Sequence, residues 1–414
     1  MKLKVIISIL IATFFYMNCS PTEQNVKNEP QKSIIELPTE SKKVKVGAAR
    51  IDQYFDLINN KNIALVVNQT SMIGDTHLAD TLQQIGMNIK AIFAPEHGFR
   101  GKADAGEKVV DGVDVKTGIP LLSLYGKNKK PSSAQLAGID LVIFDIQDVG
   151  ARFYTYISTM HYVMEACAEN GVAVLVLDRP NPNGHYVDGP ILNPAYQSFV
   201  GMHPIPVVHG MTIAEYARMV NGEGWLKDGI QCDLSTISCE NYNHETVYEL
   251  PIKPSPNLPN NRSIYLYPSL CFFEGTTISV GRGTNTQFQV YGHPDLTIGD
   301  YEFTPEPMDG AKYPKLEGKT SKGFDLTKID LTKIRTAKGL NLDYLINTYQ
   351  NYPNKKDFFL KNLFFDKLAG SAELRKQIIG GRTADQIKAT WQKDLNEFKQ
   401  LRTKYLLYNG ALKQ

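Results

Sequence analysis

The chain has 414 residues, and its 45 Lys and Arg residues nearly balance 43 Asp and Glu residues, which leaves a formal net charge of +2. Such a balance gives no support for nucleic acid or another polyanion as a partner. About 400 residues follow the N-terminal leader, enough for two domains with hydrophobic cores of their own. The composition therefore favours a globular two-domain protein.

The N-terminus has the features of an export signal. Lys2 and Lys4 form a short basic region, and the apolar run 5–17 is too short for a transmembrane helix but suits a signal peptide. We therefore predict that residues 1–18 are a signal peptide. An ordinary secretory signal or an uncleaved anchor is the alternative.

Cys19 follows the apolar run directly, which predicts lipidation of this residue after cleavage, although Asn18 departs from the small residue usual before such a cysteine. Residues 19–44 are rich in Pro, Glu, Gln, Asn, Ser and Lys and are typical of a flexible tether. We expect an exported lipoprotein that is anchored to a membrane and faces the periplasm of a Gram-negative envelope.

From residue 45 to about 185, apolar strands alternate with helical segments, which favours βαβ units. The fold class predicted is α/β, with a Rossmann-like, doubly wound, mostly parallel sheet. The chain has no G-x-G-x-x-G motif, so no dinucleotide or other cofactor is expected. The expected strands are 63–68, 89–94, 120–125, 141–144 and 172–177, and the expected helices are 76–85, 131–137 and 157–170.

The remainder contains a second, smaller α/β domain. A capping box, Thr212 to Glu215, begins a helix, and four prolines make the segment 251–262 irregular. A stripe of large apolar residues at helical spacing predicts a core-facing helix over 383–407. We expect the Rossmann-like domain to span residues 45–295 and the C-terminal domain to span residues 296–414.

Three of the expected strands end in loops that carry charged and aromatic side chains. Parallel strands commonly present functional groups at their carboxyl ends, so these three loops predict one shared site. Each acid taken alone also fits a helix cap or a turn. The loop residues are Glu96, His97 and Arg100 after the second strand; Asp145, Gln147, Asp148, Arg152, Tyr154 and Tyr156 after the fourth; and Asp178 and Arg179 after the fifth.

A further motif, PSLCFFEGTTISVGRGT at 268–284, places Glu274 before a glycine and Arg282 between two glycines. Glycines allow the backbone to approach a ligand closely, and an arginine there can clamp a carboxylate with two hydrogen bonds. The alternative is a β-bulge with a surface arginine. His209, just ahead of the capping box, is another candidate site residue.

Several acids with aromatic and arginine neighbours suit glycoside hydrolysis, in which one carboxylic acid protonates the leaving oxygen. Glu96 is a plausible general acid. No G-x-S-x-G elbow is present, which argues against acyl transfer. A divalent-metal site is the alternative, although no ligand spacing is diagnostic; it would use Asp145, Asp148, Asp178, His97 and His209.

Four cysteines follow Cys19. Cys167 lies in a helical pattern and is expected to be a small buried apolar residue. Cys232 and Cys239 have a spacing that permits pairing across a hairpin in an oxidising compartment, but free thiols are the expected outcome. No CxxC or HExxH motif supports a structural zinc site.

Seven ordered motifs resemble the exo-β-N-acetylmuramidases of glycoside hydrolase family 171, formerly known as a domain of unknown function. The resemblance covers about residues 44–414. One departure is visible after GRGT, where Gln287-Phe288 stands in place of the family's usual proline before the aromatic, which should alter a loop but not the chemistry. The motifs are PEHGFRG, DIQDVGARFYTY, LDRPNP, HGMTIAEYA, PSPNLPN, YPSLCFFEGTTISVGRGT and the terminal W-x3-L-x2-F-x3-R-x3-LLY.

This resemblance implies an enzyme that removes terminal N-acetylmuramic acid from the non-reducing end of peptidoglycan fragments. It also implies a Rossmann-like N-terminal catalytic domain and a smaller C-terminal domain, with the active site in the cleft between them. The expected partners are peptidoglycan-derived saccharides of the N-acetylmuramic acid–N-acetylglucosamine type. The family's proposed catalytic glutamate corresponds to Glu96. The motifs also place in or near the cleft His97, Arg100, Gln147, Asp148, Arg152, Tyr154, Asp178, Arg179, His209, Asn257, Glu274 and Arg282.

For the mechanism, we expect Glu96 as general acid and Asp148 as the second carboxylate. Asp148 would activate water, giving inversion, or orient the substrate's acetamido group, giving retention. Arg282 or Arg152 would select the lactyl carboxylate that N-acetylglucosamine lacks. Two alternatives are a non-catalytic muropeptide-binding lipoprotein and a metal-dependent amidase or esterase of the cell wall.

Overall fold

The structure, a computed structural model, describes residues 43–96, 98–99, 111–126 and 128–408. The predicted signal peptide, Cys19, His97 and Arg100 lie outside these residues. No helix among the described residues is both long enough and apolar enough to cross a membrane.

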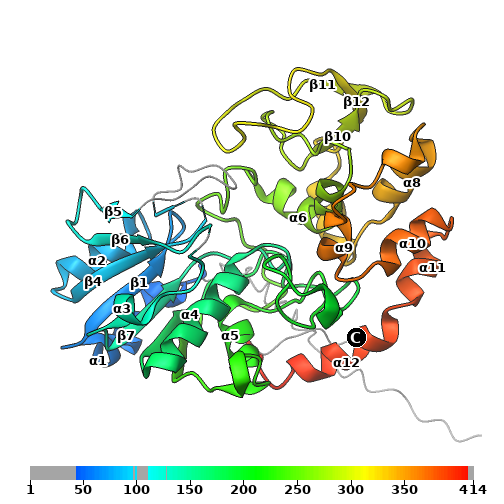
Figure 1. Ribbon diagram of the computed structural model, residues 1–414. Helices are drawn as coiled ribbons and strands as arrows, with labels where there is room; N and C mark the ends of the chain where they lie inside the picture. Colours follow the sequence, from blue (N-terminus) through cyan, green and yellow to red (C-terminus); the bar gives the residue numbers. More distant parts are fainter. Residues whose placement is uncertain (1–42, 97, 100–110, 127, 409–414) are drawn as a thin grey trace, which may run out of the picture. The chain divides into compact units, whose positions relative to one another are not determined.

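The N-terminal half is built on a mostly parallel sheet, which has seven strands within the described residues (Figure 1). All neighbours pair in parallel except the short edge strand β5, which runs antiparallel to β6. In spatial order the strands are β5 (Gly112–Val113), β6 (Pro120–Ser123), β4 (Asn88–Ala94), β1 (Asn62–Val67), β7 (Leu141–Asp145), β8 (Ala173–Leu177) and β9 (Leu234–Ile237).

Side chains of the central strands alternate between two cores, one on each face of the sheet. In β1, Ile63 and Leu65 belong to the core beneath α1 (Phe55–Ile58) and α2 (Leu78–Gln84), whereas Ala64 and Val66 belong to the core on the opposite face. Because both faces are covered, the central strands are almost continuously apolar, as expected for a parallel sheet. The helices on the opposite face include α3 (Ser133–Leu136), α4 (Tyr156–Asn170) and α5 (Ile213–Gly222).

The C-terminal half has a smaller antiparallel sheet and a series of helices. Within the described residues the order of this sheet is β10 (Val290–His293), β12 (Ser321–Asp325) and β11 (Tyr301–Phe303). A separate two-stranded hairpin, β2 (Met72–Ile73) and β3 (Thr76–His77), lies in the N-terminal half. The helices are α6 (Asn261–Leu270), α7 (Leu331–Thr336), α8 (Asp343–Asn351), α9 (Phe364–Ala369), α10 (Glu373–Ile379), α11 (Ala384–Ala389) and α12 (Gln392–Arg402).

These elements confirm the predicted fold class, a mostly parallel α/β layer followed by a smaller domain with its own sheet. The five expected strands all form, with ends that differ by at most a few residues. The predicted capping box is also present, because the Thr212 side chain accepts from the Glu215 backbone N–H and the Glu215 carboxylate accepts from that of Thr212. The domain boundary at 295/296 stays a prediction.

Two predicted helices differ from the structure. The segment 76–85 begins as β3, and His77 then caps α2 by accepting from the Ala79 backbone N–H. The single helix expected over 383–407 is two helices, α11 and α12, with a break at Thr390 and Trp391. The break lets the Trp391 indole N–H reach the carboxylate of Asp188, a long-range partner that periodicity cannot reveal.

The four cysteines within the described residues are free and buried. Cys167 lies in α4 within the main core, as predicted. Cys232 packs in that same core, whereas Cys239 belongs to a separate small cluster with Tyr242 and Tyr408. The pairing of Cys232 with Cys239 that the sequence left open is therefore not formed.

Candidate active site

A pocket with about 650 Å³ of empty space lies where the carboxyl end of the parallel sheet meets α6 and the loops that follow it. It combines carboxyl, guanidinium, amide and hydroxyl groups with several aromatic rings. Its lining residues are Glu96, Phe153, Tyr154, Thr155, Tyr156, Val200, Ser255, Asn257, Leu258, Tyr267, Glu274, Arg282 and Phe288.

Glu96 reaches this pocket because β4 ends at Ala94 and the chain turns at Pro95. The Tyr125 hydroxyl donates to its Oε1 (2.9 Å), and the Thr155 hydroxyl donates to its Oε2 (3.1 Å). Since a hydroxyl can turn to accept as well as donate, both partners can stay bonded to Glu96 whether it is ionised or protonated. That adaptability suits a group that gives up and regains a proton.

The loop from β7 to α4 supplies the wall beside Glu96. The Tyr156 hydroxyl, at the start of α4, donates to the backbone carbonyl of Glu96 (3.4 Å), and the Tyr154 hydroxyl donates to the carbonyl of Pro254 (2.8 Å). Burial raises the pKa of both phenols well above the usual value, so they remain neutral donors. The two rings meet edge to face and form a rigid aromatic surface.

Glu274 and Arg282 form the opposite wall. The Arg282 Nε donates to Glu274 Oε1 at 2.7 Å, while the two terminal nitrogens of this guanidinium make no hydrogen bond with the described residues. The guanidinium carbon lies 5.2 Å from the ring centre of Phe288, which also lines the pocket. Arg282 is therefore held along one edge, with a fork of donors left for a ligand.

The backbone around Arg282 requires its two glycines. Gly281 and Gly283 have φ angles of +76° and +83°, in the left-handed region. A Cβ on Gly283 would lie 2.7 Å from the carbonyl oxygen of Glu306. The structure thus places Arg282 in the wall of a pocket, and its role in binding a ligand stays a prediction.

Lys315 supports this wall from behind, and sequence analysis did not identify it. Its ammonium donates to the carbonyls of Thr276 (2.6 Å), Phe273 (3.1 Å) and Ile278 (3.1 Å). Burial lowers its pKa to about 8. These bonds brace the chain that runs from Glu274 toward Arg282.

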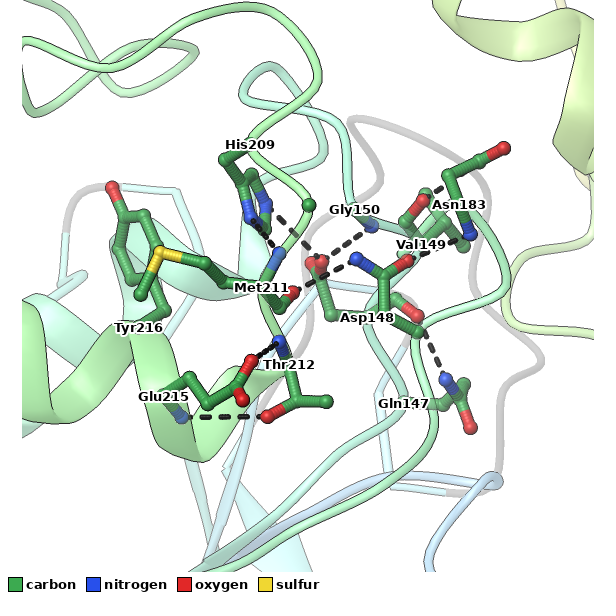
Figure 2. Close-up of polar contacts among 12 residues, drawn as sticks. Gln147, Asp148, Val149, Gly150, Asn183, His209, Met211, Thr212, Glu215 and Tyr216 are labelled. Atoms are coloured by element: carbon green, nitrogen blue, oxygen red, sulfur yellow. Dashed lines mark hydrogen bonds and ion pairs between the residues drawn. The ribbon is translucent and has the colours of Figure 1, made fainter. Parts of the chain in front are cut away.

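Asp148, the expected second carboxylate, does not line this pocket. It is 4% exposed, its Oδ2 accepts from the Gly150 backbone N–H (2.6 Å), and its Oδ1 has no partner in the described structure. Figure 2 shows the His209 ring facing this carboxylate, with Nε2 at 3.8 Å from Oδ2. Burial raises the pKa of Asp148 to about 7 and lowers that of His209 to about 3, so their neutral forms are favoured.

The other acids after the strands are tied into structural networks away from the pocket. Asp145 binds Arg179 through two bonds of 2.6 and 2.8 Å, and both residues are buried. Asp178 accepts from the Ala214 backbone N–H and from the Tyr408 hydroxyl, and burial raises its pKa to about 7. These residues join the sheet edge to neighbouring segments.

Gln147 and Arg152 also have structural partners. The Gln147 amide donates to the carbonyls of Asp148 and Pro180, both at 2.7 Å. Arg152 is fully buried and donates to three backbone carbonyls, so it is not available to a ligand in the pocket. These carbonyls belong to Pro190 (2.8 Å), Ile205 (2.5 Å) and Leu368 (3.0 Å).

The structure therefore brings together only some of the predicted site residues. Those that line the pocket are Glu96, Tyr154, Tyr156, Asn257, Glu274 and Arg282; those that do not are Asp145, Gln147, Asp148, Arg152, Asp178, Arg179 and His209. The catalytic or binding roles assigned to these residues stay predictions. Sequence analysis missed Tyr125, which it placed inside a strand, and Thr155, which stands between two tyrosines it did select.

Within the described part of the chain, no group of three or more His, Cys, Asp or Glu side chains is arranged to hold a metal ion. Asp145, Asp148 and Asp178 each have a separate set of partners, as given above. His97 of that predicted set lies outside the described residues.

Comparison with known proteins agrees with this architecture. The family models named "Exo-beta-N-acetylmuramidase NamZ, N-terminal" and "C-terminal" match residues 63–262 and 265–408. The chain is 38% identical over 379 residues to the peptidoglycan beta-N-acetylmuramidase NamZ of Bacillus subtilis (strain 168), covering 86% of this chain and 89% of that protein.

Two crystal structures of DUF1343 family proteins from Bacteroides fragilis NCTC 9343 are also similar. One has 51% identity and a TM-score of 0.83, the other 29% identity and a TM-score of 0.76. Each match covers 88% of this chain and 99% of the other. These findings confirm the resemblance inferred from the motifs: the chain belongs to the NamZ family of exo-β-N-acetylmuramidases.

Proposed function

We propose that the pocket around Glu96 is the active site with which this glycosidase releases terminal, β-linked N-acetylmuramic acid from the non-reducing end of peptidoglycan fragments. The family assignment supports the reaction. The observation that supports the site is the meeting, in one pocket, of the PEHG glutamate and an arginine with unused donors.

In this proposal Glu96 is the general acid. It would protonate the glycosidic oxygen as the bond to the anomeric carbon breaks, which makes the leaving sugar neutral. Tyr125 and Thr155 hold the two carboxyl oxygens, so the acid is fixed against the pocket wall before the substrate arrives.

Arg282 would supply the selectivity for N-acetylmuramic acid. Its terminal nitrogens can bind the lactyl carboxylate with two parallel charge-assisted bonds. N-acetylglucosamine lacks that group and would leave the guanidinium unpaired, which penalises its binding. Tyr154, Tyr156, Tyr267 and Phe288 offer faces and edges for the sugar ring.

Two carboxylates are candidates for the second catalytic role. Asp148 is the residue expected from the motifs, whereas Glu274 is the acid that shares the pocket with Glu96. Asp148→Asn and Glu274→Gln separate them: the variant that removes the second carboxylate should lower kcat at least a hundredfold. Following the anomeric proton by NMR during turnover would show inversion or retention.

The decisive variant for the site is Glu96→Gln, which keeps the size and the hydrogen-bonding capacity but cannot donate the catalytic proton. Turnover of a chromogenic β-N-acetylmuramic acid glycoside should fall by about a thousandfold or more, while binding changes less than threefold. The matched control is Glu302→Gln, an exposed position on β11, which should behave as the parent. Turnover near the parent level in Glu96→Gln would remove Glu96 from the mechanism.

We also propose that Cys19 carries a lipid anchor that holds the enzyme to a membrane, where wall fragments are generated. The support is the basic and apolar leader directly before this cysteine. Expression of the full chain and of Cys19→Ala, followed by detergent partitioning and mass spectrometry of the N-terminal peptide, tests it. Identical aqueous partitioning of both proteins would contradict the proposal.

A further inference from the structure

A second pocket, with about 690 Å³ of empty space, lies on another side of α6 and shares no lining residue with the active-site pocket. Tyr267 of α6 faces the active site, whereas Tyr265 and Ser269 of the same helix line the second pocket. The rest of its wall comes from the segment 183–186 and from residues 329–344. The mechanism proposed above makes no use of it.

Three buried side-chain atoms around this pocket have no hydrogen-bond partner in the described structure: Asn183 Oδ1, His185 Nδ1 and Arg335 Nε. Asn183 and His185 are each only 1% exposed. Leaving a buried polar atom unpaired is costly, so unpaired atoms grouped around one cavity indicate a place where a ligand completes the bonding.

The other hydrogen bonds of these residues determine whether each unpaired atom is a donor or an acceptor. His185 Nε2 lies 2.9 Å from the Arg335 carbonyl oxygen, so Nε2 carries the ring proton and Nδ1 is left as an acceptor. The Asn183 Nδ2 donates to the carbonyls of Val149 (2.9 Å) and Ile264 (3.1 Å), which fixes its Oδ1 as an acceptor. Burial lowers the pKa of His185 to about 4, so the ring stays neutral at neutral pH.

The charge of the pocket restricts the ligand further. Its described lining includes Lys333 and Arg335 but no Asp or Glu. Arg335 donates through one terminal nitrogen to the carbonyl of Glu245 (2.7 Å), which is a neutral partner. Tyr265 and Tyr344 supply aromatic surface. An anion without O–H donors would satisfy the two cations but not the two acceptors.

We infer that this pocket is a second saccharide site, which binds an acidic sugar through ring hydroxyls and a carboxylate. The hydroxyls donate to Asn183 Oδ1 and His185 Nδ1, the carboxylate pairs with Arg335 and Lys333, and the sugar ring packs on the tyrosines. This site would hold a second sugar of a wall fragment, or a released one, apart from the catalytic pocket. Binding at this second site does not depend on catalysis at Glu96. Only the choice of N-acetylmuramic acid as the probe rests on the proposed function.

The test is a ligand-observed NMR titration of the full chain with free N-acetylmuramic acid, which the enzyme cannot hydrolyse. In this assay the Arg282→Gln substitution serves to abolish binding of the sugar in the active-site pocket. In that variant the sugar should still bind saturably. Adding Lys333→Ala and Arg335→Gln should weaken binding at least tenfold, whereas the matched control Lys328→Ala, an exposed lysine outside the lining, should change it less than twofold.

Three further measurements determine which class of ligand binds and whether the second site is independent of the active site. N-acetylglucosamine should bind at least tenfold more weakly, and acetate and inorganic phosphate should not saturate. Lys333→Ala with Arg335→Gln, in the otherwise unchanged enzyme, should retain its melting temperature and its turnover of a chromogenic substrate. Loss of all binding in Arg282→Gln, no effect of the Lys333 and Arg335 substitutions, or equal saturation by phosphate would each overturn the inference.

Discussion

At the scale of single residues, the proposed mechanism assigns substrate choice to Arg282. One edge of its guanidinium binds Glu274, and its two terminal nitrogens have no hydrogen-bond partner among the described residues. Arg282→Gln should lower kcat/KM for an N-acetylmuramic acid glycoside by about a hundredfold, because a bidentate charge-assisted pair is lost.

The same substitution should leave the low turnover of the N-acetylglucosamine analogue within a few-fold of the parent. Arg282→Lys keeps the charge but not the planar fork and should recover only part of the selectivity. Measurement of kcat/KM for both substrates in the three proteins checks this. An equal decrease in kcat/KM for both substrates would show that Arg282 does not bind the lactyl carboxylate.

The buried carboxyl group of Asp148 should make the stability of the fold depend on pH, whether or not Asp148 takes part in catalysis. Its pKa is about 7 in the folded protein against 3.8 in a free side chain, so between these values only the folded state keeps the proton. Stability from this group is fully present below about pH 4 and is lost as pH rises through 7. Asp148→Asn removes that dependence.

The unfolding free energy of Asp148→Asn relative to the parent should therefore increase between pH 4 and pH 7.5. Urea unfolding at several pH values measures it. Asp300→Asn, at an exposed position, is the matched control and should show a constant difference. A constant difference for Asp148→Asn as well would mean that the folded protein does not hold a protonated Asp148.

At the scale of elements, Lys315 braces the segment between α6 and β10 that carries Glu274 and Arg282. Lys315→Met removes the donor that joins the carbonyls of Phe273, Thr276 and Ile278, so the pocket wall should loosen. KM for the N-acetylmuramic acid glycoside should rise about tenfold or more, with a smaller change in kcat.

The pH profile separates positioning from simple destabilisation. In the parent, deprotonation of Lys315 near pH 8 should weaken the brace and lower kcat/KM on the alkaline side. This limb should be absent from Lys315→Met, and the exposed control Lys319→Met should keep it. An unchanged KM and an unchanged alkaline limb would show that the wall holds without Lys315.

The elements near the site also show what a sequence can and cannot reveal. Apolar runs ending in charged loops were enough to predict the parallel sheet and the edge beside which the pocket lies, because both follow from local patterning. Which loop residues enter the pocket depends on partners far away in sequence. Asp178 is bound by Tyr408 and Arg152 by Leu368, and no local pattern announces either pairing.

The same limit explains the residues that sequence analysis missed. Tyr125 ends a short apolar run and looks like a strand residue, yet its hydroxyl reaches Glu96 from the neighbouring strand's end. Lys315 lies in an ordinary charged loop, and only the folded chain brings the carbonyls of residues 273–278 around it. By contrast, Glu274 and Arg282 were selected because glycines flank them. Those beside Arg282 have left-handed φ angles, and a Cβ on Gly275 would lie 2.4 Å from the Cα of Phe365.

At the scale of the whole molecule, Arg152 joins segments that are far apart in the chain. Its guanidinium donates to carbonyls of Pro190, Ile205 and Leu368, the last of these in α9 of the C-terminal half. Arg152→Met should lower the unfolding free energy by about 3 kcal/mol or more, since three buried carbonyls lose their donor.

Urea unfolding checks this, with Arg382→Met, an exposed arginine, as the matched control. The control should lie within about 0.5 kcal/mol of the parent. Because Arg152 does not line the pocket, the folded fraction of Arg152→Met should still prefer the N-acetylmuramic acid substrate. Loss of that preference with unchanged stability would make Arg152 a binding residue.

The proposed activity of the whole enzyme, release of N-acetylmuramic acid, can be tested in one assay. The full chain is given a chromogenic β-N-acetylmuramic acid glycoside and its N-acetylglucosamine counterpart, each with and without a chelator. We expect turnover of the N-acetylmuramic acid glycoside, unchanged by the chelator, and at most a low turnover of its counterpart. Absence of turnover with both, together with saturable binding, would contradict the account and make the protein a wall-fragment-binding protein; activity lost with chelator would point to a metal-dependent hydrolase.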